Sequence, residues 1–362
     1  MKSNLLPLGL LTLLLSSSLS GASAQPGPAA AAKKADEEWL ALKDLGQPKS
    51  QSPGGPVSPA AAAQARQQFA VGLVRDADRL KEFRTTNPAH AGAKKAKRLE
   101  ALLLVQAWRA GASSSASRRT QLVAEIRGDA SLPAASRAEV AALAEHVAVA
   151  KRPGLSRDGR LAAYEQAVRG LTAEFPELPN GYESLVQIAK DSSDAKAQAI
   201  ARNVLGLAAA PATVKAEAQI LLDRHALVGR PVAELVRPIL GAANPIERAK
   251  GRPLVLYSWA TFAAGSHALA ADLAARTPAG VALVGLCLDF RDLAPAKALA
   301  TAQKLPGEQL YDWLGRRGEV AERLKLTDPA LAFVIDAGGI IRAVSAQRDL
   351  PATLAALAAT KP

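Results

Sequence analysis

The residues of this chain best suited to chemistry are one cysteine and four histidines. The histidines His90, His146, His225 and His267 are far apart in the sequence, and none has a second histidine four residues away. Protein zinc sites use several nitrogen or sulfur ligands, commonly at short spacings. We therefore expect no metal site. We interpret His267 as an ordinary polar residue on the first turn of a helix.

The single thiol belongs to Cys287, within the apolar run Ala282–Leu288. One cysteine cannot form an intramolecular disulfide. A continuous apolar run is typical of a buried central strand, and a reactive thiol needs exposure and a cationic or helix-terminal setting. We interpret Cys287 as a small core residue.

Signatures of other common chemistries are missing from the sequence. It contains no serine-hydrolase elbow, no phosphate-binding loop and no dinucleotide fingerprint. Asp336–Gly339 is rich in turn residues, but a strand rather than a helix is expected after it, so it predicts a hairpin turn. We expect no cofactor.

The charge of the chain is strongly basic, with a formal net charge of +12. Lysine and arginine are spread along helical segments and alternate with acidic residues, without a run of five like charges and without interleaved aromatic residues. This pattern is typical of solvated helix faces. We expect no nucleic-acid partner.

The N-terminal residues Met1–Ala24 have the pattern of a secretory signal peptide. Lys2 precedes the apolar segment Leu5–Leu15, and Ala22–Ala24 has the small residues of a cleavage site. The apolar segment is too short to span a bilayer, which needs about 20 residues. We expect cleavage after Ala24, a periplasmic or secreted location and no membrane span in the mature chain.

The next segment, Gln25–Val57, is rich in alanine, proline and glycine and is predicted to be a low-complexity linker. Within it, Lys33–Leu45 has the spacing of a short amphipathic helix, with Trp39 on its apolar side.

The region Ser58–Leu227 is predicted to be an α-helical domain. Ser58 and Pro59 suit the N-cap and first position of a helix. Apolar residues at helical spacing and short breaks predict further helices at His90–Ala110, Arg118–Arg127, Ser136–Val149, Arg157–Phe175, Tyr182–Lys190, Ala195–Leu207 and Val214–Leu227. Two interpretations stay open, tetratricopeptide-like (TPR-like) hairpins or a non-repeating bundle.

The region Val228–Pro362 changes to alternating strands and helices, which predicts an α/β domain with a parallel core. The final strand pair is joined by Asp336–Gly339 as a hairpin. The resulting β-α-β-α-β-β-α order is that of a thioredoxin-like fold. The predicted elements are Leu254–Ala260, Gly265–Arg276, Ala282–Asp289, Leu293–Lys304, Glu319–Lys325, Leu331–Asp336, Ile340–Ser345 and Leu350–Thr360.

Four segments in order resemble the redoxin domain (AhpC/TSA-type) of TlpA-like and ResA-like exported thiol–disulfide oxidoreductases. The resemblance spans Gly229–Pro362, and such proteins often carry a helical N-terminal extension. The segments are Gly229–Pro231, Lys250–Phe262, Val284–Asp289 and Phe333–Ile341.

The resemblance implies a tryptophan followed by a Cys-x-x-Cys dithiol where the first helix begins. There, backbone N–H groups and the helix dipole stabilise a thiolate. Here Phe262 matches the tryptophan, Ala263 the attacking cysteine and Ser266 the resolving cysteine. Neither side chain can exchange disulfides, and we expect Ser266 to cap the helix. Cys287 cannot replace them as in a one-cysteine peroxiredoxin, because it lies on the second predicted strand of the domain, away from the helix N-terminus at Ala263.

The resemblance also implies a cis-proline before the strand that ends at Asp336. Counted back without gaps, that position is Ala330, and Pro329 lies one residue earlier. We expect a degenerate loop here as well.

Together these patterns predict an exported thioredoxin-like protein without its dithiol, a pseudoenzyme that serves as a binding or assembly module for a protein partner in the periplasm. One alternative is an enzyme, either a TlpA-family thiol–disulfide oxidoreductase or an unknown redox-related activity. A further alternative is a structural helical-repeat protein whose C-terminal domain is a vestige.

Overall fold

The computed structural model describes residues 28–45, 58–240, 244–249, 251–290, 292–311 and 314–346. The predicted signal peptide, parts of the predicted linker and the helix predicted over Leu350–Thr360 lie outside these residues. The chain forms two compact units, Met1–Leu178 and Pro179–Pro362. The predicted boundary follows Leu227, whereas the second compact unit also includes the three helices between Pro179 and that residue.

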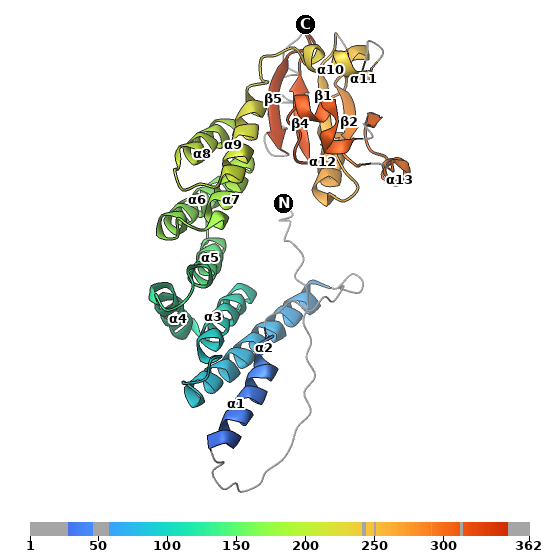
Figure 1. The fold of residues 1–362 in the computed structure, drawn as a ribbon. Coiled ribbons are helices and arrows are strands. Elements are labelled where there is room, and N and C mark those ends of the chain that lie inside the picture. The colour runs from blue at the N-terminus through green and yellow to red at the C-terminus, as the bar shows by residue number, and fades with distance from the viewer. Residues whose placement is uncertain are drawn as a thin grey trace. The chain divides into compact units, whose positions relative to one another are not determined.

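The first unit is helical where it is described (Figure 1). As predicted, the Ser58 hydroxyl caps α2 by accepting a hydrogen bond from the Ala61 N–H at 3.2 Å. Part of the predicted linker forms α1. The helices are α1 (Pro28–Leu42), α2 (Pro59–Thr86), α3 (Ala93–Ala110), α4 (Ala116–Gly128), α5 (Ala134–Lys151) and α6 (Arg157–Glu174).

The core of this unit joins α1 to the helices that follow. Trp39 of α1 stacks on Phe83 of α2, with 5.5 Å between ring centroids. Glu100 of α3 is fully buried and accepts hydrogen bonds from Arg84 and Arg118 at 2.6 and 2.7 Å. A buried carboxylate is costly without such partners, so these ion pairs stabilise the packing of α2, α3 and α4.

The second unit starts with helices and continues into a sheet (Figure 1). Its helices are α7 (Pro179–Lys190), α8 (Asp194–Gly206), α9 (Ala212–His225), α10 (Val232–Leu240), α11 (Pro245–Arg248), α12 (Ala264–Arg276), α13 (Ala294–Ala302), the 3-10 helix η1 (Gly315–Arg317) and α14 (Glu319–Arg323). Its strands are β1 (Leu254–Trp259), β2 (Ala282–Cys287), β3 (Glu308–Tyr311), β4 (Leu331–Ile335) and β5 (Ile341–Ala346).

The five strands form one mixed sheet in the order β3-β2-β1-β4-β5. Strand β1 is parallel to β2 and antiparallel to β4, and β4 pairs antiparallel with β5. The β1-α12-β2 unit and the β4-β5 hairpin on its other side are the central arrangement of the thioredoxin-like fold. The predicted α/β fold class, with helices N-terminal to it, is therefore confirmed.

Both faces of the sheet are covered, as the strand pattern requires. Leu254 and Leu256 of β1 pack in one core with residues of α10, α11 and α14, whereas Val255, Tyr257 and Trp259 pack in a second core with α12 and α13. Successive residues of a strand point to opposite faces, which explains why all six residues of β1 are buried.

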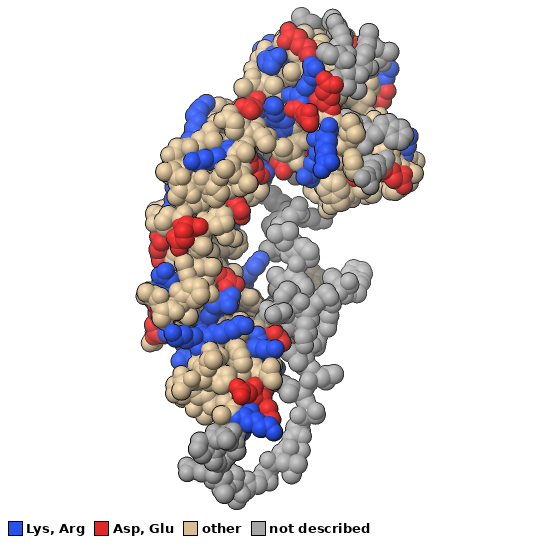
Figure 2. Space-filling view, in the orientation of Figure 1, with Lys and Arg blue, Asp and Glu red and all other residues tan. Residues whose placement is uncertain are grey.

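Basic and acidic side chains alternate over the surface in view (Figure 2). None of the helices in the described ranges is both long and apolar enough to cross a membrane.

Candidate functional site

The candidate site is the turn from β1 into α12. Ala263 occupies the N-cap position of α12, with φ −114° and ψ 88°, and no side chain caps this end of the helix. Ser266 is the third residue of α12 and is fully buried. The two positions that match the dithiol of the redoxins thus lie where a helix N-terminus would stabilise a thiolate.

The Ser266 hydroxyl is engaged by the turn itself. It donates a hydrogen bond to the Ala263 carbonyl oxygen at 2.6 Å and accepts one from the Ala260 N–H at 3.2 Å. The expectation that Ser266 caps α12 needs correction, because its partners are groups of the preceding turn and not the free N–H groups of the helix. Its hydroxyl is buried and already bonded, so it is not presented to solvent as a nucleophile.

Two further side chains hold the same turn. The His267 Nε2–H donates to the Ala260 carbonyl oxygen at 3.0 Å. Asp289, just beyond the end of β2, accepts hydrogen bonds from the Thr261 N–H at 3.1 Å and the Thr261 hydroxyl at 3.0 Å. His267 is therefore a structural residue of the turn, which agrees with the ordinary role expected for it.

The loop before β4 approaches the end of β1. The Ser258 carbonyl oxygen accepts a hydrogen bond from the Ala330 N–H, and the Ser258 hydroxyl accepts one from the Leu331 N–H, both at 3.1 Å. Ala330 has φ 77°, in the left-handed region that is unfavourable for residues other than glycine. No cis peptide bond occurs in the described part of the chain, which includes Pro329.

Cys287 is the last residue of β2 and pairs with Trp259 of β1. Its side chain is fully buried, which confirms the prediction of a core residue. Burial raises the pKa of the Cys287 thiol to about 12, and the nearby Asp289 carboxylate at 3.4 Å adds to this rise. Thiol exchange requires a thiolate, so this thiol is held in its unreactive form.

The four histidines lie at separate places. His90 contacts Asp36 at 3.0 Å, and His146 stacks on Tyr164 with 4.9 Å between ring centroids. His225 lies 4.0 Å from an Asp194 carboxylate oxygen. No group of three histidine, cysteine or acidic side chains suited to a metal ion occurs within the ranges that the structure describes.

A polar network missed by the sequence analysis holds the loop before β4. The nearly buried Arg224 of α9 donates hydrogen bonds to the Lys325 carbonyl oxygen and the Thr327 hydroxyl, both at 2.9 Å. Lys190 of α7 lies 3.2 Å from Asp328. Arg224 and Lys325 are 101 residues apart, so local spacing does not reveal this contact. The position of an arginine among apolar residues of a helix is only a weak signal of it.

The side chains of the turn offer no group for disulfide exchange. Ala263 has only a methyl group, Ser266 is hydrogen-bonded within the turn, and the Cys287 thiol is buried in the sheet. Beside them Phe262 is exposed to solvent. The site is therefore that of a thioredoxin-fold protein with a rigid turn and an apolar surface.

Comparisons with solved structures find similarity over part of the chain. A thioredoxin-like protein from Parabacteroides distasonis is 24% identical, with 31% of this chain and 83% of that chain covered and a TM-score of 0.25. A secreted disulfide oxidoreductase from Mycobacterium tuberculosis is 19% identical, with 30% and 85% covered and a TM-score of 0.25. A thioredoxin-family thiol:disulfide interchange protein from Chlorobium tepidum is 16% identical, with 30% and 82% covered and a TM-score of 0.25.

Neither a protein-family profile nor a curated protein matches the sequence. At these TM-scores the fold assignment rests on the strand order and pairing of the sheet itself.

Proposed function

We propose that this chain is an exported, non-catalytic binding protein that uses its thioredoxin-like domain to hold a protein partner in the cell envelope. The observation that carries the proposal is the hydrogen bond from the Ser266 hydroxyl to the Ala263 carbonyl oxygen. At the helix N-terminus where a redoxin dithiol would lie, one side chain is a methyl group and the other is bonded within the turn.

The surrounding turn is nevertheless held in place by side-chain hydrogen bonds. Asp289, His267 and Ser266 each fix part of the segment Ala260–Ala263 by hydrogen bonds. A turn held by three side chains through hydrogen bonds is preorganised, and preorganisation lowers the cost of binding a partner. The hydrogen-bonded turn and its exposed Phe262 favour a binding role over the alternative that the C-terminal domain is a vestige.

A disulfide-exchange assay on the mature protein tests this proposal. Reduction of insulin disulfides by dithiothreitol is followed with and without the protein, and Cys287→Ser serves as the matched variant. The proposal predicts background rates for both proteins. Turnover that disappears in Cys287→Ser would overturn it and favour the enzyme alternative, whereas equal turnover in both proteins identifies a contaminating oxidoreductase, which repurification removes.

A further inference from the structure

Three large apolar side chains of the second unit are exposed on neighbouring segments. Phe262 has 65% of its surface exposed, Phe290 has 48% and Leu314 has 54%. These are three of the six large apolar residues that are exposed within the described ranges, the others being Leu40, Val71 and Val228. Scattered exposed apolar residues are common, but a group of them beside one another marks an interaction site.

The three segments that carry these residues are brought together by contacts at their bases. The Thr261 N–H bonds to Asp289, which places Phe262 and Phe290 on adjoining turns. Gly315 packs against the end of β2 so closely that a Cβ there would lie 2.7 Å from the Leu288 carbonyl oxygen. The turns after β1 and β2 and the start of η1 therefore form one surface.

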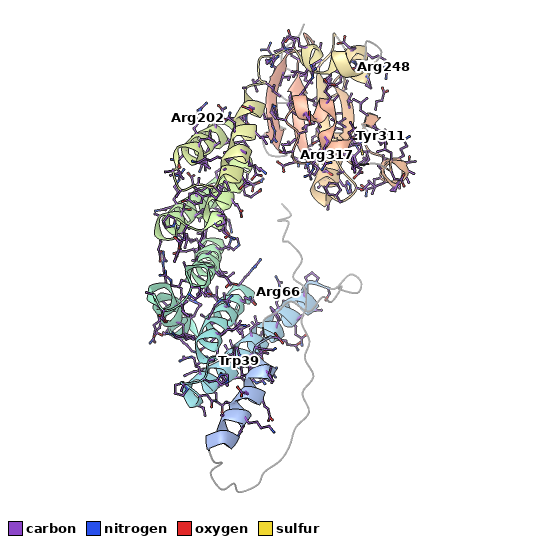
Figure 3. All side chains as sticks on the ribbon, viewed as in Figure 1. Trp39, Arg66, Arg202, Arg248, Tyr311 and Arg317 are labelled. Carbon is purple, nitrogen blue, oxygen red and sulfur yellow. The ribbon has the colours of Figure 1, made fainter. Side chains whose placement is uncertain are left out.

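Two exposed arginines border this surface. The Arg316 guanidinium carbon lies 5.5 Å from the centre of the Phe262 ring. That of Arg317, which Figure 3 labels, lies 5.9 Å from the centre of the Phe290 ring. We call the five residues Phe262, Phe290, Leu314, Arg316 and Arg317 the Phe–Arg patch. Arginine over an aromatic ring keeps the in-plane N–H groups of its guanidinium available for a carboxylate.

The two arginines of the patch have no acidic partner among the residues that the structure describes. Neither Arg316 nor Arg317 forms an ion pair within the described ranges, although Glu319 is close in sequence and pairs with Arg323 at 2.7 Å. Asp289 is buried and directed at Thr261. A complementary partner would thus bring carboxylates for the arginines and an apolar group for the rings.

We propose that the Phe–Arg patch binds an acidic peptide segment of a protein partner. An apolar side chain of the segment covers Phe262 and Phe290, and carboxylates on either side of it pair with Arg316 and Arg317. This inference rests on the proposed function and names the partner chemistry of the same site. A peptide fits better than a nucleic acid, because a peptide can supply an apolar side chain for the exposed rings together with carboxylates for the two arginines.

Fluorescence anisotropy of labelled synthetic peptides tests the proposal on the mature full-length chain. The main probe is a short peptide with a Phe-Leu pair flanked by glutamates. One comparison peptide replaces glutamate with lysine, and another replaces Phe-Leu with Ala-Ala. We expect the acidic apolar peptide to bind at least about tenfold more tightly than either comparison peptide, and more weakly as salt is raised.

Substitutions locate the binding. Arg316→Glu with Arg317→Glu, and separately Phe262→Ala with Phe290→Ala, are each expected to weaken binding of the acidic peptide by about tenfold or more. The matched control is Arg252→Glu, because Arg252 is an exposed arginine at the opposite end of β1. Circular dichroism and thermal melting confirm that each variant is folded before it is titrated.

The outcomes distinguish this inference from the proposed function. Loss of binding in both patch variants with retention in Arg252→Glu supports the patch. The inference is overturned by absence of binding, by equal binding of the lysine peptide or by unchanged binding in the patch variants. Tighter binding of an oligothymidylate, titrated as the nucleic-acid probe, would also overturn it. None of these results bears on disulfide exchange, which the insulin assay measures separately.

Discussion

The Ser266 hydroxyl donates a hydrogen bond to the carbonyl oxygen of Ala263 at 2.6 Å. The sequence resemblance matches these two residues to the two cysteines of the redoxins. The same hydroxyl also accepts a hydrogen bond from the Ala260 N–H. A serine at this place joins the strand end, the turn and the first turn of α12. The contact is structural, because neither side chain carries a thiol.

Ser266→Ala is the direct test of that structural role. The substitution leaves the Ala260 N–H without its side-chain acceptor at a buried position, so we expect a loss of about 1–3 kcal/mol in the free energy of unfolding. Urea denaturation measures it. The control is Ser184→Ala, since Ser184 is exposed and its hydroxyl bonds within α7 to the Asn180 carbonyl oxygen. A control change beyond about 0.5 kcal/mol, or no effect at Ser266, would contradict the assignment.

Ala330→Pro tests how far the loop before β4 has diverged from the proline loop that the resemblance implied. Proline fixes φ near −65° and has no N–H, whereas Ala330 has φ 77° and donates to the Ser258 carbonyl oxygen. We expect a destabilisation of about 3 kcal/mol or more. Ala330→Gly, which tolerates positive φ, should keep nearly the original stability. A proline variant as stable as the glycine variant would show that the loop readily adopts another conformation.

The Cys287 thiol gives a prediction on pH. Folding raises its pKa to about 12, whereas an unfolded cysteine ionises near pH 8.5. Above that value the unfolded chain releases a proton that the folded chain keeps, so the stability contributed by the neutral thiol is lost as pH rises from about 8.5 towards 12.

Labelling with a thiol reagent measures this directly. Exposed thiols become reactive at roughly pH 7 to 9. In this range we expect native Cys287 to react only as fast as the protein unfolds. In denaturant the same thiol should react at once and with normal pH dependence. Rapid labelling of the native protein that rises with pH would show an accessible thiol and argue against its burial in the sheet.

Much of the α/β domain could be predicted because its signals are local. The apolar run that begins at Leu254 and the one around Cys287 form strands β1 and β2 within two residues of the expected ends. Burial of Cys287 followed from the same continuous pattern, since a strand covered on both faces has no polar side.

What the sequence could not show depends on contacts between distant residues. The bond from Arg224 to the Lys325 carbonyl oxygen and the approach of Arg317 to Phe290 have no local spacing to reveal them. Strand β3 was not predicted either, because four residues at the sheet edge with partly exposed side chains lack an apolar run. The role of Ser266 was misjudged since its acceptor lies before the helix.

Arg224→Ala tests the network that ties α9 to the loop before β4. The variant loses two hydrogen bonds from a buried guanidinium, to the Lys325 carbonyl oxygen and the Thr327 hydroxyl. We expect a loss of about 2–3 kcal/mol in unfolding free energy and faster amide hydrogen exchange at residues 325–331. The control is Arg202→Ala on α8, an exposed arginine bonded to Gln198 (Figure 3). Equal effects of the two substitutions would contradict a special role for Arg224.

The most direct test of the central claim compares the natural chain with the double substitution Ala263→Cys/Ser266→Cys in the insulin-reduction assay. The account predicts that the natural chain reduces insulin only at the background rate, because the turn has the backbone of a redoxin site but no thiols. The double variant should gain measurable disulfide exchange, because its thiols lie at the N-terminus of α12. Turnover by the natural chain that Cys287→Ser abolishes would contradict the account.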